Sequence, residues 1–125
     1  MNTALWVVQV VLAIFMLMPG SLKLMNSIDE LIAKGKGRMD WAEDISATNM
    51  KIIGLLEVLA AIGLILPMAI GFYPILTPLA AVGVILTMIG AISLHLKRGD
   101  EPKSWMINVV IIVLAAFVAY GRYFL

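Results

Sequence analysis

Four long runs of apolar residues dominate the hydrophobic pattern of this chain, separated by two charged segments and one tight uncharged turn. The runs cover about residues 4–25, 50–70, 75–96 and 105–123. An α-helix needs about 20 mainly apolar residues to span the hydrocarbon core of a bilayer. The pattern therefore predicts four membrane-spanning helices.

The polar segment between the first two runs, residues 26–50, has a helical pattern of its own. Ile28, Leu31 and Ile32 recur at helical spacing beside charged residues, which is typical of a short amphipathic helix in the membrane interface. Trp41 follows, and tryptophan is a residue type enriched at the headgroup level. Two interpretations stay open, because the segment fits either a solvated connector or a lid over a site between the membrane helices.

Composition leads to the same class of protein. Of the 125 residues, 62% are hydrophobic and 14% are charged, and the mean hydropathy is +1.03. A soluble domain is usually about half apolar and a quarter charged, so this chain lacks the polar side chains needed to cover a water-facing surface. Its length fits a single domain over residues 1–125. The predicted fold class is all-α, an integral membrane four-helix bundle with a short interfacial helix between helices one and two.

Residue types exclude several kinds of chemistry. The chain has no cysteine, so it forms no disulfide and no thiolate metal site. A net charge of +1 without a basic run gives no indication of nucleic-acid binding. The single histidine cannot supply a bis-histidine haem within one protomer. We expect no metal site and no covalently bound cofactor.

Basic residues collect at one end of the predicted bundle. The loops after helices one and three share one side of a four-span protein, and eight of the nine Lys and Arg residues lie in or beside them. Because Lys and Arg collect on the cytoplasmic side, we expect both charged loops inside and both termini outside. The ninth, Arg122, is interpreted as an interfacial anchor, and Gln9 as a side chain that hydrogen-bonds across helices.

Each predicted helix places one polar side chain at a similar depth near the charged loops. Glu57 lies roughly 9 Å along its helix from Lys51 at about 1.5 Å per residue, and Lys23, His95 and Asn108 lie near the loop-side ends of the other helices. An isolated charge at the bilayer centre costs about 2.5–3.5 kcal/mol on insertion scales, so these groups are expected to converge on the bundle interior. The pattern predicts a ligand-binding site formed by all four and closed by a Lys23–Glu57 ion pair. The alternative is that Lys23 only neutralises Glu57 and holds two helices in register.

A set of short motifs runs in order along the chain: Gly20-x-x-Lys23-Leu24, Gly54-Leu-Leu-Glu57, Gly63-Leu-Ile-Leu-Pro67, Thr77-Pro-Leu-Ala-Ala-Val-Gly83, His95-Leu-Lys-Arg-Gly99 and Ala119-Tyr-Gly-Arg122. Together they resemble the DoxX-like family of small bacterial membrane proteins over the length of the chain. Pro19, where a small residue is more familiar, departs from the pattern. The resemblance implies the bacterial cytoplasmic (inner) membrane and a redox or stress-response setting, and its pattern includes Lys23, Glu57 and His95.

The resemblance favours an accessory subunit of a quinone-linked system that holds a quinone or a lipid headgroup at this site. Its partners would then be the lipid bilayer, a redox enzyme and further copies of the chain. Two alternatives stay open: a small proton-coupled transporter that works as an oligomer, and a membrane anchor for a soluble partner. Catalysis by the chain alone has the least support, because no nucleophile–base pair or metal-ligand set is visible.

Overall fold

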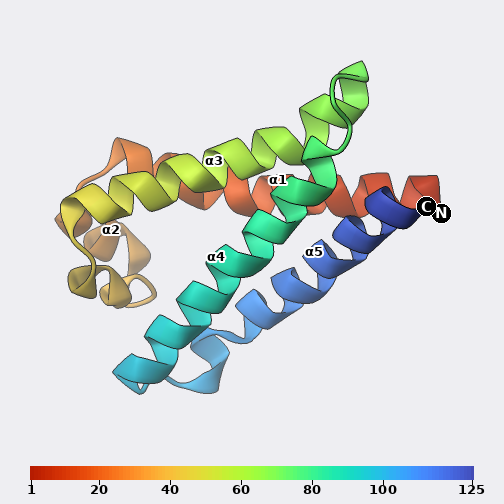
Figure 1. Cartoon of the computed structure of the whole chain (residues 1–125). Helices are drawn as coiled ribbons and strands as arrows, with labels where there is room; N and C mark the ends of the chain where they lie inside the picture. The colour runs from red at the N-terminus through yellow and green to blue at the C-terminus, as the bar shows by residue number, and fades with distance from the viewer.

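The computed structural model describes all residues 1–125 as helices joined by short loops, without strands (Figure 1). The α-helices are α1 (Asn2–Met25), α2 (Ile28–Gly35), α3 (Ala47–Ile70), α4 (Leu76–Arg98) and α5 (Met106–Phe124). Two 3₁₀ helices, η1 (Asp40–Asp44) and η2 (Pro102–Ser104), lie in the two charged loops. The helices α1, α3, α4 and α5 are long and apolar enough to cross a membrane. The predicted all-α membrane bundle is confirmed.

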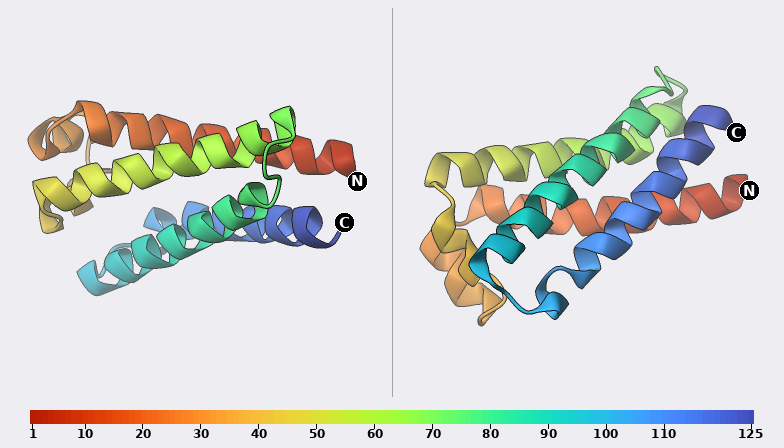
Figure 2. Two further views of the ribbon diagram at one scale, coloured as in Figure 1. Left: turned by 45° about the horizontal axis from the view of Figure 1, so that its top comes forward. Right: turned by 60° about the horizontal axis from the view of Figure 1, so that its bottom comes forward.

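The four long helices form two antiparallel pairs arranged as two layers (Figure 2). In one layer α1 packs along α3, and in the other α4 packs along α5. The layers meet near the α3–α4 turn and spread apart toward the opposite end, where α2 and η1 lie (Figure 1). The short elements of the first charged loop therefore sit at the open end of the bundle.

An apolar core fills the space between the layers. Its ten buried members come from all four long helices: Leu12, Met16, Ala61, Leu64, Ala81, Val84, Met88, Ile111, Ala115 and Val118. Large apolar side chains on the outer faces, such as Val7, Leu55 and Leu86, are instead about half exposed or more. This inverted exposure suits a protein whose surrounding solvent is lipid.

A second, smaller core fixes α2 and η1 to the start of α3. It is formed by Leu31, Ala42 and Met50. The helix α2 begins with a capping box, in which the Ser27 hydroxyl accepts a hydrogen bond from the Glu30 N–H and the Glu30 carboxylate accepts one from the Ser27 N–H. The backbone hydrogen bond from Ser27 also lowers the pKa of Glu30. The one buried side chain of α2, Leu31, therefore faces the protein.

The helices α1 and α3 approach most closely where a glycine of each faces a charged residue of the other. A Cβ atom on Gly20 would lie 2.9 Å from the Cβ of Glu57, and one on Gly54 would lie 2.8 Å from the Cβ of Lys23. Small residues allow helix backbones to approach in a membrane. Because the helices are antiparallel, the spacings Gly20-x-x-Lys23 and Gly54-x-x-Glu57 produce this reciprocal fit.

A proline in α3 leaves a backbone group that α4 satisfies. Pro67 has no N–H, so the carbonyl of Gly63 loses its usual helical donor. The hydroxyl of the fully buried Thr77 donates to that carbonyl at 2.9 Å. The bond joins α3 to α4 beside the turn that connects them.

Substitution of Gly54 by valine tests the close contact between α1 and α3. Gly54→Val is expected to lower the free energy of unfolding in detergent by about 1–3 kcal/mol, the usual cost of overpacking. Gly83→Val is the matched control, because a Cβ atom at Gly83 meets no atom within 4 Å. Equal stability of the two variants would contradict the contact.

The bond between Thr77 and Gly63 is tested by a double-mutant cycle with Pro67. Thr77→Val is expected to lower the free energy of unfolding by about 0.6–1.7 kcal/mol, the range of interhelical hydrogen bonds in membranes. In a Pro67→Ala background the loss is expected to shrink, because the restored backbone N–H satisfies the Gly63 carbonyl. The same loss in both backgrounds would show that Pro67 does not create the need for Thr77.

Candidate functional site

Lys23 of α1 and Glu57 of α3 form an ion pair inside the bundle. The Lys23 Nζ lies 2.5 Å from the Glu57 Oε1, and the two side chains are only 8% and 4% exposed. The facing glycines, Gly20 and Gly54, make room for both side chains. Removal of either partner would leave a buried charge unpaired, which is strongly destabilising.

The ion pair leaves hydrogen-bonding groups unused. An ammonium group has three N–H donors, and Lys23 uses one of them, on Glu57. The second carboxylate oxygen of Glu57, Oε2, accepts no hydrogen bond. The pair can therefore offer a donor and an acceptor to a further molecule. No group of three or more His, Asp or Glu side chains is placed to hold a metal ion.

Trp41 of η1 links the ion pair to His95 at the end of α4. The Lys23 Nζ lies 5.5 Å from the centroid of the Trp41 ring, within the range of a cation–π contact. The rings of Trp41 and His95 meet edge to face, with centroids 6.2 Å apart. The structure thus brings Lys23, Glu57, Trp41 and His95 into one group, called here the lid-side cluster. From the sequence, Trp41 was expected at the headgroup level and was not among the predicted site residues.

A network of charged side chains fastens η1 to the end of α4. The Arg98 guanidinium lies 2.8 Å from Asp44 and 3.3 Å from Glu43. On its other side Arg98 lies 3.3 Å from Asp100, whose carboxylate is 2.8 Å from the Nδ1 of His95. The hydrogen bond with His95 holds the pKa of Asp100 below its usual value. We call the contacts of Arg98 with Glu43 and Asp44 the latch.

Asn108, the fourth predicted site residue, is not joined to the lid-side cluster. It lies partly buried in the first turn of α5, and its side chain makes no hydrogen bond with Lys23, Glu57 or His95. The helix α5 packs mainly on α4, whereas the ion pair belongs to α1 and α3. A shared depth does not determine which way a side chain faces around its helix.

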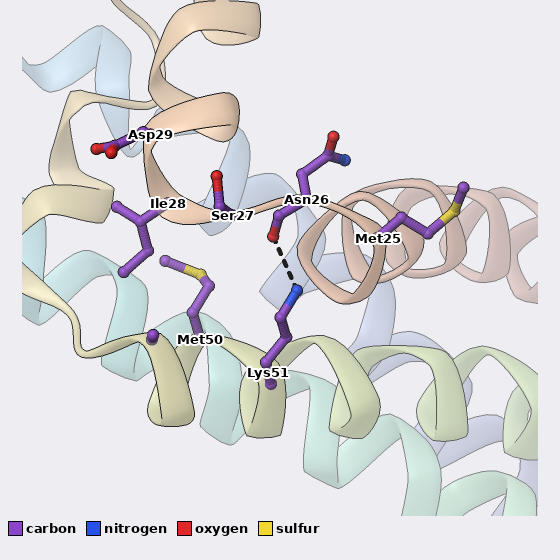
Figure 3. Close-up of a pocket in the computed structure, with 8 residues that line it drawn as sticks. Met25, Asn26, Ser27, Ile28, Asp29, Met50 and Lys51 are labelled. Atoms are coloured by element: carbon purple, nitrogen blue, oxygen red, sulfur yellow. Dashed lines mark hydrogen bonds between the residues drawn. The ribbon is translucent and has the colours of Figure 1, made fainter.

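An open pocket of about 330 Å³ lies at the turn from α1 to α2 (Figure 3). Asn26, Asp29 and Lys51 are among its lining residues, and none of the four predicted site residues lines it. The ammonium group of Lys51 donates to the backbone carbonyls of Lys23, Leu24 and Asn26 at 2.8–3.0 Å. The carbonyls of Lys23 and Leu24 lie in the last turn of α1 and lack helical partners, and Asn26 is the residue that follows the helix. Lys51 therefore serves to close the helix end.

Comparison with known proteins identifies the family. The model of the DoxX-like family matches residues 7–118, a range that contains Lys23, Glu57 and His95. No curated protein and no solved structure matches the chain. The family match covers most of the sequence, and the four long apolar helices agree with a protein that crosses the membrane several times. This multi-pass membrane protein therefore belongs to the DoxX-like family.

Proposed function

We propose that the protein binds a small amphipathic molecule, a quinone or a lipid headgroup, at the lid-side cluster. The observation that carries the proposal is the unused hydrogen-bonding capacity of the buried Lys23–Glu57 pair. Ionisable residues inside a membrane are costly and commonly mark ligand or ion sites. A buried ion pair is, by itself, weak evidence for stability. Binding accounts for the pair better than folding alone.

The donors and acceptors of the cluster suit an oxygen-bearing ring. A quinone carbonyl would accept a hydrogen bond from Lys23, and a quinol hydroxyl would donate one to the Oε2 of Glu57. A lipid headgroup would use the same ammonium group of Lys23. Either ligand requires the Trp41 ring to move aside, because it covers the ammonium group.

The element that would move is the lid, defined as α2 together with η1 (residues 28–44). Its attachment to α4 includes the latch, in which the Glu43 and Asp44 side chains are 62% and 45% exposed. Exposed ion pairs contribute little to stability, and the core that joins the lid to α3 has only three buried residues. The helices α1 and α3, in contrast, are joined by close packing and a buried ion pair. Opening of the lid is therefore the easiest route to Lys23 and Glu57.

The same proposal assigns the protein a role as an accessory, non-catalytic component of a quinone-linked redox or stress-response system in the bacterial cytoplasmic membrane. Without cysteine or a metal-ligand set, electrons would come from a partner enzyme or a diffusible quinol. Eight of the nine basic residues lie toward the lid end, which favours a cytoplasmic lid and external termini.

Two alternative functions stay open. Proton-coupled transport is tested by efflux from proteoliposomes, and anchoring of a soluble partner is tested by pull-down.

The binding proposal is tested with Glu57→Gln, which removes the charge and keeps the size of the side chain. Mass spectrometry of copurified small molecules is expected to find a quinone or a defined lipid with the unmodified protein. Retention is expected to fall about 10-fold to 100-fold in Glu57→Gln, the loss of one hydrogen bond to a charged group. Addition of a short-chain quinone to protein in nanodiscs measures the same loss as a binding constant.

Thr77→Val is the control for this experiment, because it weakens the bundle away from the lid-side cluster. The double variant Lys23→Met with Glu57→Gln removes both charges and is expected to recover stability without recovering binding. If Glu57→Gln keeps the same quinone or lipid as the unmodified protein, the ion pair is structural and the proposed function is wrong.

The latch is tested by thiol labelling, since the chain has no cysteine of its own. Ala42 of η1 is fully buried, so a single Ala42→Cys substitution is expected to react slowly with a water-soluble maleimide. Adding Arg98→Gln is expected to increase the labelling rate several-fold, because it breaks the contacts with Glu43 and Asp44. Lys103→Gln, which removes only an exposed pair with Glu101, is the control. Equal rates in the two backgrounds would show that the latch does not hold the lid.

A further inference from the structure

A second polar cluster lies at the other end of the bundle, where the start of α1 meets the end of α5 (Figure 1). The Nε of Arg122 donates to the Gln9 Oε1 at 2.6 Å, and its Nη1 donates to the Asn2 Oδ1 at 2.8 Å. The guanidinium carbon lies 5.4 Å from the centroid of the Trp6 ring. Gln9 is fully buried, and its Nε2 donates to the carbonyl of Leu64 at 2.6 Å. Arg122 is therefore held in one orientation by several contacts.

Arg122 has no carboxylate partner in the chain. Seven of the eight acidic residues lie in the lid and in the loop after α4, at the other end of the bundle. The eighth, Glu57, is paired with Lys23. No ion pair involves Arg122. The far end of the bundle thus carries a side-chain cation that the chain's own acidic side chains do not neutralise.

The guanidinium also has donors to spare. Of its five N–H groups, one binds Gln9 and one binds Asn2. The Nη2 is enclosed by the protein and has no hydrogen-bond acceptor, although Arg122 as a whole is only partly buried. A buried donor without an acceptor on a charged group is destabilising. The enclosed Nη2 is out of reach of an outside group, but the Nη1 contact with Asn2 is exposed and leaves one N–H of that nitrogen free. That free donor and the missing counter-charge indicate an anionic group from outside the chain.

We propose that Arg122, positioned by Gln9 and Asn2, binds a phosphate group at this face of the membrane. Guanidinium–phosphate contacts are charge-assisted and stronger than contacts between neutral groups, so the remaining N–H of the Nη1 suits a phosphate oxygen. The chemistry fits the phosphodiester of a phospholipid headgroup as well as free phosphate from the water. Trp6 is a residue type of the headgroup level, which favours the lipid.

Gln9 distinguishes this site from an ordinary interfacial anchor. A long basic side chain reaches the membrane surface by its own flexibility and needs no fixed support. A buried amide, in contrast, is destabilising unless it is hydrogen-bonded. The amide nitrogen of Gln9 donates to the Leu64 carbonyl, and its amide oxygen accepts from Arg122. Its role is to orient the guanidinium. The site is independent of the ligand proposed for the lid-side cluster.

The test compares phosphate-bearing and phosphate-free lipids on the full chain. In the unmodified protein, phosphatidylglycerol is expected to raise the melting temperature in mixed micelles and to remain bound in native mass spectrometry. Monogalactosyldiacylglycerol, which lacks phosphate, is expected to do neither. In Arg122→Gln the retained phospholipid is expected to fall about tenfold or more, as for the loss of one charged hydrogen bond. Lys103→Gln removes a charge at the other end and is expected to change nothing.

Two further variants separate positioning from charge. Gln9→Met keeps the cation and is expected to reduce phospholipid retention. Arg122→Lys keeps the charge without the planar guanidinium that Gln9 and Asn2 hold, and it is expected to retain less than the unmodified protein. If inorganic phosphate at matched ionic strength gives the full rise in melting temperature, the phosphate site is supported with a soluble ligand as its source. Equal effects of the two lipids on the unmodified protein, or an equal loss in Lys103→Gln, would overturn the proposal.

Discussion

The Lys23–Glu57 ion pair sets the arrangement of the rest of this structure, because two charges must be placed where lipid cannot solvate them. Gly20 and Gly54 bring the backbones of α1 and α3 close enough for the pair to form. The other layer spreads away from this contact, and the lid occupies the space that is left (Figure 1). The position of Trp41 over Lys23 follows from that geometry.

The same requirement explains the other polar contacts of the bundle. Thr77 satisfies the carbonyl that Pro67 leaves without a donor, and Lys51 satisfies the carbonyls at the end of α1. The donors of Thr77 and Lys51 are bound to backbone carbonyls, so both contacts are structural. The lid-side cluster and Arg122 are different, because each keeps donors or acceptors that the chain does not use. Unused capacity at a buried polar group is what separates a candidate binding site from a structural bond.

The sequence predicted the features that depend on local pattern. Apolar length and hydropathy locate four membrane helices because a span must be mainly apolar over about 20 residues, whether its side chains face lipid or the core. Depth along the helices predicted the meeting of Lys23 and Glu57, since consecutive long helices run antiparallel. Depth does not give the direction around a helix, and the side chain of Asn108 makes no hydrogen bond with the other three predicted residues. Trp41 was missed because its place depends on how far the two layers spread apart.

The two ends of the bundle differ in charge, and this difference limits what each can bind. The lid-side ion pair is neutral as a unit, so it suits a neutral, oxygen-bearing molecule such as a quinone. Arg122 keeps its positive charge and suits an anion. The buried apolar side chains of Leu12, Met16 and Leu64 lie between the two ends, so neither site neutralises the other across the membrane. The two proposed sites in this chain of 125 residues therefore call for two chemically different ligands.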